Sequence, residues 1–288
     1  DDALTLVGST FTANEAVSQG GAVHVSTSGS LDATLATFDG NLATGTGADA
    51  GAVHLRSDAT FDTCTFVGNS AADDGGALYV QNGASVDVLD SEFDANVSGS
   101  GGGAILNDSS TVSVEGSLFT SNTAVWGGAV YDYGSTGSLS VDDSVLTDNA
   151  ASLGGGAGMN GSGGVLRFTN SDISSNAATA AAGDGGAFAI GTGGVLTLDT
   201  CTLDDNTAGD HGGAIATSGT GTTVNLTDAD LSGNIAGSYG GGISASYYIG
   251  YPTVTVTRGS ITSNVASTGG GIYASGYITA TSVNMGAT

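Results

Sequence analysis

Residues 66–78 read FVGNSAADDGGAL, in which an asparagine follows an apolar residue by three positions and precedes a glycine pair. This asparagine occurs in ten copies at a nearly constant step. The copies are Asn14, Asn41, Asn69, Asn96, Asn122, Asn149, Asn176, Asn206, Asn234 and Asn264. The step averages about 28 residues, a length typical of solenoids and other repeat arrays. Such a chain grows one unit at a time around a continuous core, so we predict one domain over residues 1–288.

Apolar and polar residues alternate in short stretches of each repeat. Positions ten and eight before the asparagine are apolar, as at Val86 and Val88, and a stretch after the glycine pair holds Leu78 and Val80. Alternation with a period of two predicts a strand with one buried face. The apolar positions five and three before the asparagine change parity, which indicates a corner. Three short strands and three corners per repeat predict an all-β chain, a parallel β-helix of about ten coils.

The asparagines and the glycine pairs are expected to be architectural. An asparagine at a corner tolerates a left-handed backbone, and its amide can both donate and accept hydrogen bonds. Amides stacked one coil apart would form a ladder that satisfies buried backbone groups. The glycine pair is expected to supply positive φ or a close backbone approach at a second corner.

The two cysteines, Cys64 and Cys201, each lie five residues before a repeat asparagine, in a column of small residues. They are five coils apart, which at about 4.8 Å per coil separates them by roughly 24 Å. A disulfide requires Cα atoms within about 7 Å, so these two cannot pair. Both are predicted to be small core residues.

The chain is strongly acidic, with 28 Asp and Glu residues, three Arg, no Lys and a formal net charge of −25. This balance argues against nucleic acid and anionic membranes as partners, because both attract Lys and Arg. Insertion of this chain into a membrane is not expected. Acidic pairs at the corners either stay solvated or bind Ca²⁺, the only cofactor that these pairs indicate. The pairs are Asp73 and Asp74, Asp142 and Asp143, and Asp204 and Asp205.

His24 and His54 occupy the same outward position of successive coils, where their side chains would lie about 5 Å apart. Either a shared metal ion or an incidental exposed stack fits this pair. The bulky stripe that continues from them predicts partner contact, through Tyr79 and Tyr131, or packing between strands. The column continues through Tyr79, Leu106, Tyr131 and Met159 before it turns small at Ala189, Ala216 and Ser244.

Tyrosines are concentrated near the C-terminal end, partly in an irregular insertion at residues 246–252. Tyr247, Tyr248, Tyr251 and Tyr277 are candidate partner-binding residues, although a cap over the helix end would use them equally well. Exposed strand edges at the two ends would also allow separate molecules to associate end to end as a filament, and lateral association is the alternative.

The alternation of a Gly-Gly-Ala-Ile-like motif with Phe-x-x-Asn resembles the repeats of the polymorphic outer membrane proteins, known from chlamydiae and other bacteria. Gly76-Ala77-Leu78 with Phe93-Asp94-Ala95-Asn96 is one example, and the resemblance covers essentially the whole chain. It implies a right-handed parallel β-helix exposed on a cell surface, often as the passenger of an autotransporter, with roles in adhesion. After Phe119 the motif carries Leu or Ile in place of Phe. The family supplies no catalytic residues to carry over.

We therefore expect an extracellular, non-catalytic structural or adhesive module that binds a surface ligand or assembles with itself. The first alternative is a polysaccharide-active lyase or hydrolase, which requires a groove with clustered carboxylates. The arginines lie at different repeat positions and the histidines lack the context of a triad, so the sequence places no catalytic residues. The second alternative is an ice- or mineral-binding face. The column that begins with Thr5, Asp32 and Thr60 is too irregular to favour it.

Overall fold

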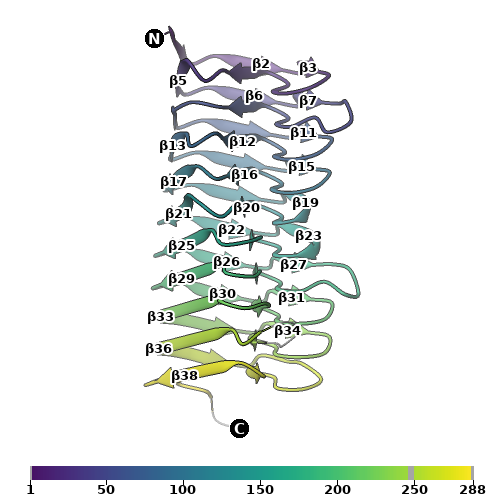
Figure 1. The fold of residues 1–288 in the computed structure, drawn as a ribbon, viewed down its shortest axis with the longest axis vertical. Helices are drawn as coiled ribbons and strands as arrows, with labels where there is room; N and C mark the ends of the chain where they lie inside the picture. Colours follow the sequence, from purple (N-terminus) through teal and green to yellow (C-terminus); the bar gives the residue numbers. More distant parts are fainter. Residues whose placement is uncertain (1, 246–249, 287–288) are drawn as a thin grey trace.

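The computed structural model describes residues 2–245 and 250–286. Within these ranges the chain forms 38 β-strands and no helix, so no helix there could span a membrane. Each strand pairs in parallel with its counterparts in the coils before and after it, and the coils stack along one axis (Figure 1). The predicted all-β parallel β-helix of about ten coils is confirmed.

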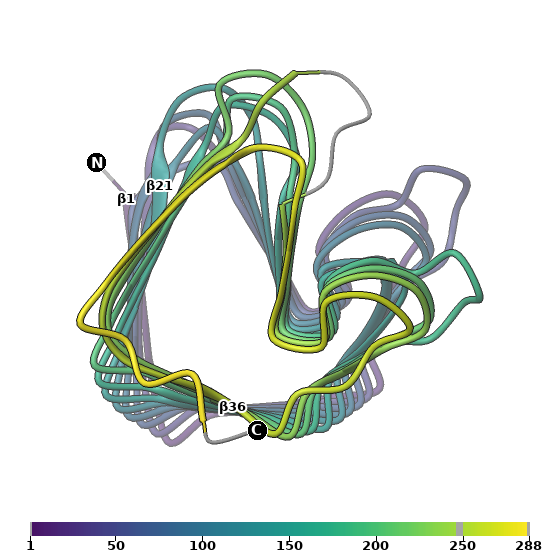
Figure 2. The ribbon, with the colours of Figure 1, turned by 90° about the horizontal axis from the view of Figure 1, so that it is seen from below.

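Three parallel sheets run along the axis (Figure 2). The largest has nineteen strands in two series, which join because β33 and β36 extend through both. The first series is β1 Asp2–Val7, β5 Gly29–Thr34, β9 Ala59–Asp62, β13 Ser85–Leu89, β17 Thr111–Glu115, β21 Ser138–Asp142, β25 Val165–Thr169, β29 Val195–Asp199, β33 Thr223–Ser232, β36 Thr253–Thr262 and β38 Tyr277–Thr281. The second series is β2 Thr10–Thr12, β6 Thr37–Asp39, β10 Thr65–Val67, β14 Glu92–Asp94, β18 Leu118–Thr120, β22 Val145–Thr147, β26 Asp172–Ser174 and β30 Thr202–Asp204.

The second sheet follows the ladder asparagines and consists of very short strands. They are β3 Glu15–Ala16, β7 Leu42–Ala43, β11 Ser70–Ala71, β15 Val97–Ser98, β19 Thr123–Trp126, β23 Ala150–Gly154, β27 Ala177–Ala178, β31 Thr207–Ala208 and β34 Ile235–Ala236. The third sheet follows the glycine pairs. Its strands are β4 Val23–Val25, β8 Val53–Leu55, β12 Leu78–Gln81, β16 Ile105–Asp108, β20 Val130–Tyr133, β24 Gly158–Asn160, β28 Phe188–Ile190, β32 Ile215–Thr217, β35 Ile243–Ala245 and β37 Ile272–Ala274.

The core consists of columns in which like side chains stack from coil to coil. Phe66 and Phe93, three residues before their asparagines, stack with ring centroids 4.6 Å apart and planes 4° from parallel. Phe119 continues this stack at 4.7 Å. Cys64 and Cys201 are free and buried, as predicted for small core residues. Because the residues of each column are alike in size and polarity, each coil presents a matching surface on which the next coil packs.

The repeat asparagines form a continuous ladder of hydrogen bonds. Oδ1 of Asn69 accepts from the backbone N–H of Asn41 at 3.0 Å and from its Nδ2 at 2.9 Å. Nδ2 of Asn41 also donates to the carbonyl oxygen of Phe11 at 2.9 Å. The same pattern runs without a gap from Asn14 to Asn264. Each amide therefore joins three successive coils at a corner.

The prediction that these asparagines take a left-handed backbone is wrong. Positive φ falls one residue earlier, as at Ala95 (54°) and Ser121 (57°), so the preceding residue turns the corner and the asparagine amide points along the stack. In the glycine pair, the first glycine has the expected positive φ and the second makes the expected close backbone approach. Gly75 has a φ of 68°, and a Cβ on Gly76 would overlap the carbonyl oxygen of Gly103.

A second ladder lies in the column of small residues that also holds the cysteines. Oγ of Ser91 accepts from the backbone N–H of Cys64 at 3.0 Å, and Oγ of Ser117 accepts from that of Ser91 at 3.0 Å. Ser91 Oγ also donates to the carbonyl oxygen of Leu89 at 2.7 Å. The recurrence of serine in a column that alanine could fill is the sequence signal for this second ladder.

Polar residues interrupt the apolar inner face of the third sheet in three successive coils, and Thr217 follows in the same column two coils later. Asn107, Asp132 and Asn160 pair in register and are fully buried. Asn107 Nδ2 donates to Asp132 Oδ1 at 2.8 Å. In the described residues, Asp132 Oδ2 and the amide of Asn160 have no partner of hydrogen-bonding geometry. Burial raises the pKa of Asp132 to about 7, and Asn107 and the backbone N–H of Val165 offset this rise only in part.

Asn149→Ala should lower the free energy of unfolding by roughly 1–3 kcal/mol, because buried groups that bond to its amide lose their partner. These groups include the backbone N–H of Asn122 and the carbonyl oxygen of Phe119. Denaturant titration measures the change. Asn225→Ala removes the same atoms from a half-buried position on β33 and should cost less than about 0.5 kcal/mol. Equal losses for both variants would show that the ladder does not stabilise the fold.

Asp132→Asn should stabilise the protein above pH 7. The unfolded chain loses the Asp132 proton near pH 3.8, whereas the folded state keeps it to about pH 7, so stability falls as the pH rises between these values. The rise in pKa corresponds to at most about 4 kcal/mol. Melting curves at pH 4 and pH 8 should show that Asp132→Asn lacks this loss and that the exposed Asp87→Asn retains it. Identical pH dependence in Asp132→Asn and the wild type would contradict the assignment.

Candidate functional site

The outer face of the third sheet carries the column that begins with His24 and His54. We call this the floor column: His24, His54, Tyr79, Leu106, Tyr131, Met159, Ala189, Ala216, Ser244 and Tyr273. The expectation of an exposed histidine stack is wrong for His54, which is fully buried, whereas His24 is exposed. The segment between each ladder asparagine and the next glycine pair folds back and runs beside this face (Figure 2).

That covering segment contributes one residue per coil to a wall beside the floor, directly before the glycine pair or, at Asp49, before Ala50-Gly51. We call this the wall column: Gln19, Asp49, Asp74, Gly101, Trp126, Gly154, Asp184, His211, Tyr239 and Thr268. Wall and floor side chains meet directly. The ring centroids of Tyr239 and Tyr273 are 4.4 Å apart, and a Cβ on Gly154 would lie 3.2 Å from Cβ of Ala189.

A pocket of about 370 Å³ opens where both columns become small. Ala189 and Ala216 form its floor, and Gly154 leaves the wall open. Trp126 and Asp184 line it from the wall column, two coils apart. Its volume lies within the range of small-molecule sites, about 300–1,000 Å³. The change from bulky to small residues, visible in the sequence, therefore produces a cavity.

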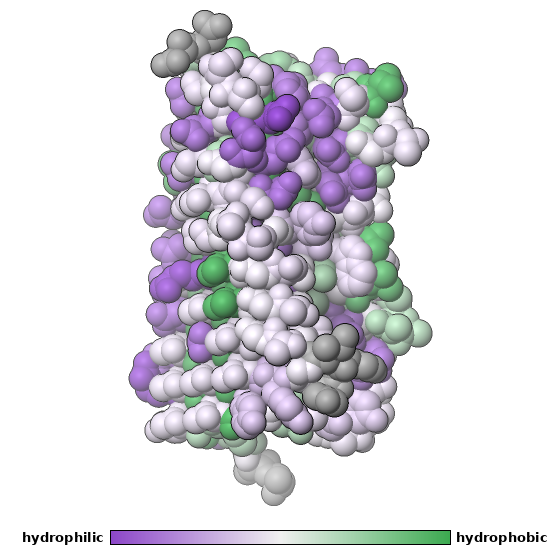
Figure 3. All heavy atoms as spheres, viewed as in Figure 1, coloured by the Kyte–Doolittle hydropathy of each residue, from purple (hydrophilic) through white to green (hydrophobic). Residues whose placement is uncertain are grey.

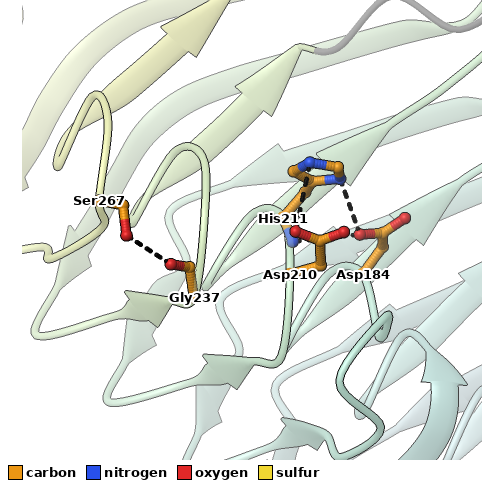
Figure 4. A network of polar contacts seen from close by, with 5 residues as sticks. All are labelled: Asp184, Asp210, His211, Gly237 and Ser267. Carbon is orange, nitrogen blue, oxygen red and sulfur yellow. Dashed lines mark hydrogen bonds and ion pairs between the residues drawn. The ribbon is translucent and has the colours of Figure 1, made fainter.

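Asp184, Asp210 and His211 converge beside this pocket (Figure 4). Nδ1 of His211 lies 3.0 Å from Asp184 Oδ1, and Nε2 lies 3.5 Å from Asp210 Oδ1. The backbone N–H of His211 also donates to Asp184 Oδ1 at 3.1 Å. Burial raises the pKa of Asp184, and His211 opposes this rise. The Asp184 side chain is 43% exposed, so its carboxylate is accessible to a ligand.

A second acidic group occupies the same repeat positions five coils earlier. Its ligand atoms also lie within 4.8 Å of one another, and burial raises the pKa of Asp49 to about 6. The floor beside this group is filled by the rings of His54 and Tyr79, stacked at 5.3 Å. Asp49 occupies the repeat position of Asp184. Likewise, Asp73 corresponds to Asp210 and Asp74 to His211.

The Ca²⁺ hypothesis remains a prediction at Asp73 and Asp74, which the structure joins with Asp49. The spacing of the acidic pairs did not reveal this third carboxylate, because it lies in the coil before. Asp143 and Asp205 have positive φ at corners, 47° and 55°. In the described chain, the following residues belong to no such group of three: Asp142, Asp143, Asp204 and Asp205.

The histidine pair has the predicted spacing, with ring centroids of His24 and His54 4.7 Å apart. Nδ1 of His54 lies 3.0 Å from Nδ1 of His24, and Nε2 lies 2.8 Å from Nε2 of Gln81. Burial, followed by His24 and Arg56, lowers the pKa of His54 to about 4. Both ring nitrogens of His54 are thus engaged within the chain, which favours packing over a shared metal ion.

The tyrosines proposed for partner contact lie in two separate places. Tyr79 and Tyr131 belong to the floor column. Tyr251 and Tyr277 are 56% and 67% exposed, with ring centroids 5.8 Å apart. Two further residues lie outside the described part of the chain, namely Tyr247 and Tyr248.

Sequence reasoning missed the pocket residues Trp126, Asp184 and His211. Each lies directly before a glycine pair, at a position where the repeats differ from one another. A variable residue next to the constant glycine pair is the sequence signal that could have identified the wall column. The sequence could not predict that these wall residues lie beside the floor column, because this depends on how the covering segment folds back.

The stacked coils, the asparagine ladder and the three parallel sheets define a parallel β-helix with a lateral pocket. A family described as "Right handed beta helix region" matches residues 1–173. The match covers more than half of the sequence, so the chain belongs to the right-handed β-helix family. This fold occurs in surface proteins and in polysaccharide-active enzymes alike. No curated protein and no solved structure matches the chain.

Proposed function

We propose that this chain is an extracellular adhesive module whose lateral pocket binds a segment of a polysaccharide. The observation that carries this proposal is the pocket itself, which combines the ring of Trp126 with the carboxylate of Asp184. A sugar presents an apolar C–H face and a ring of hydroxyl groups, so an aromatic ring and hydrogen-bond acceptors recognise it together. The resemblance to polymorphic outer membrane protein repeats supports the location on a cell surface.

The lining of the pocket supplies further polar groups for such a ligand. Thr192 and Ser218 are exposed and contribute hydroxyl groups that can donate or accept hydrogen bonds. Met159 and Ala189 contribute apolar surface. An apolar cavity with a few convergent polar groups is the usual form of a small-ligand site.

The face drawn in Figure 3 also favours a polar ligand over a large apolar partner. Figure 3 shows hydrophilic residues gathered over the N-terminal coils of the face drawn, with hydrophobic residues only in small separate groups. Sites for protein partners usually expose a larger continuous apolar patch. The net charge of −25 makes acidic polysaccharides unfavourable, so neutral or cationic chains are the expected ligands.

The proposal is tested by glycan binding and by filling the pocket. Wild-type protein should bind a subset of surface polysaccharides on a glycan array. Ala216→Tyr should abolish this binding without unfolding the protein, because other floor positions, such as Tyr131, already carry tyrosine. Val17→Tyr, which adds the same side chain at an exposed position in the first coil that does not line the pocket, is the control. Binding that survives Ala216→Tyr would rule out the pocket as the site.

A second candidate function is hydrolysis of a polysaccharide, which the paired carboxylates of Asp184 and Asp210 favour. Their oxygens lie within 4.8 Å of each other, near the separation of about 5 Å in retaining glycosidases. Burial raises the pKa of Asp184, which suits it to protonate a leaving group. Asp210 would then be the nucleophile.

Hydrolysis is distinguished from adhesion by the release of reducing ends. If the pair is catalytic, polysaccharides that bind should gain reducing ends over time, and Asp184→Asn should lower this rate at least a hundredfold. Asp49→Asn, at the equivalent position of the other acidic group, should leave it unchanged. Binding without any new reducing ends would leave adhesion as the function.

A further inference from the structure

Resting on the proposed function, we propose that the pocket selects a sugar unit that carries a primary ammonium group. The ligand class is thus a polysaccharide with free amino groups, such as β-1,4-linked glucosamine. The sugar face would lie against Trp126 while the ammonium group meets Asp184. These two residues are two coils apart in the wall column, about 10 Å along the axis.

The first argument is the charge of the pocket. Asp184 lines it, and none of the described lining residues is Lys or Arg. Asp210 adds a second carboxylate close by, and both are grouped with His211. Of the three arginines, Arg258 pairs with Asp228 on another part of the surface, with Nη2 2.6 Å from Oδ2. A ligand cation would therefore find an acidic site in which the protein supplies no lysine or arginine.

The second argument is the comparison of the two acidic groups. Both place carboxylates at the same repeat positions, and burial raises the pKa of Asp49 as it does that of Asp184. Only beside Asp184 does the floor become small, at Ala189 and Ala216. Beside Asp184, a carboxylate therefore borders a space in which a ligand fits. Beside Asp49, the equivalent carboxylate borders the packed rings of His54 and Tyr79.

The third argument is the strength of the expected contact. A hydrogen bond between an ammonium group and a carboxylate is charge-assisted and roughly twice as strong as a neutral one. An aromatic ring near the cation adds a further attraction. An N-acetylated sugar keeps the ring face but loses the charge, so it should lose most of the affinity that the contact with Asp184 provides.

The inference is tested by the fluorescence of Trp126, which is the only tryptophan of the chain. The probes are a tetramer of β-1,4-linked glucosamine and its fully N-acetylated form. The glucosamine tetramer should shift the fluorescence with a Kd at least tenfold lower than that of the acetylated form. Asp184→Asn should remove this difference. Asp49→Asn is the matched control and should retain it, and melting curves confirm that both variants are folded.

Three other results would overturn the inference. Equal affinity for both tetramers, unchanged in Asp184→Asn, would show that the pocket binds sugars without selecting an amine, and the proposed function would stand. Equal weakening by Asp49→Asn and Asp184→Asn would show that the general acidity of the rod attracts the amine. If neither tetramer changes the fluorescence while glycan binding elsewhere survives Ala216→Tyr, both the selectivity and the pocket assignment are wrong.

Discussion

Every coil of this protein depends on hydrogen bonds that run along the helix axis. The strands provide these bonds through their backbones, but a corner breaks the strand and leaves backbone groups without a partner. The asparagine amide bridges this gap. At Asn41, one side chain donates to the coil before and to the coil after, as the carbonyl oxygen of Phe11 and Oδ1 of Asn69 show. Each coil must therefore bring its amide above the next, although the number of residues between them varies from 26 at Asn96 and Asn122 to 30 at Asn176 and Asn206.

This constraint separates the positions that are fixed from those that can vary. The ladder asparagines, the core columns and the glycine pairs hold the coil together, so their residue types repeat. The floor and wall columns lie outside both ladders, and there the residue type changes from coil to coil, as between Tyr131 and Ala216. The pocket opens where these two columns become small, and the adjoining loops complete its lining with residues such as Thr192 and Ser218. Asp132 is the exception, since it is a buried carboxylate within the frame itself.

The fold could be predicted from the sequence because its determinants recur ten times in the same order. The inward columns, the stacking asparagines and the free cysteines all follow from spacing. The left-handed residue was placed one position too late, because spacing does not show which residue turns the chain. The site was harder to predict. Asp184 and Ala189 lie five residues apart, yet they face one pocket only because the covering segment folds back on the third sheet.

The two columns that meet at the pocket also divide the helix axis into equal steps. Each coil advances the wall and the floor together by about 4.8 Å, and neither column contributes to the ladder. Exchanging small and bulky residues between coils should therefore open or close space between wall and floor in steps of about 4.8 Å. The acidic groups at Asp49 and Asp184 lie five such steps apart. Of these two groups, only the one at Asp184 lies beside a pocket.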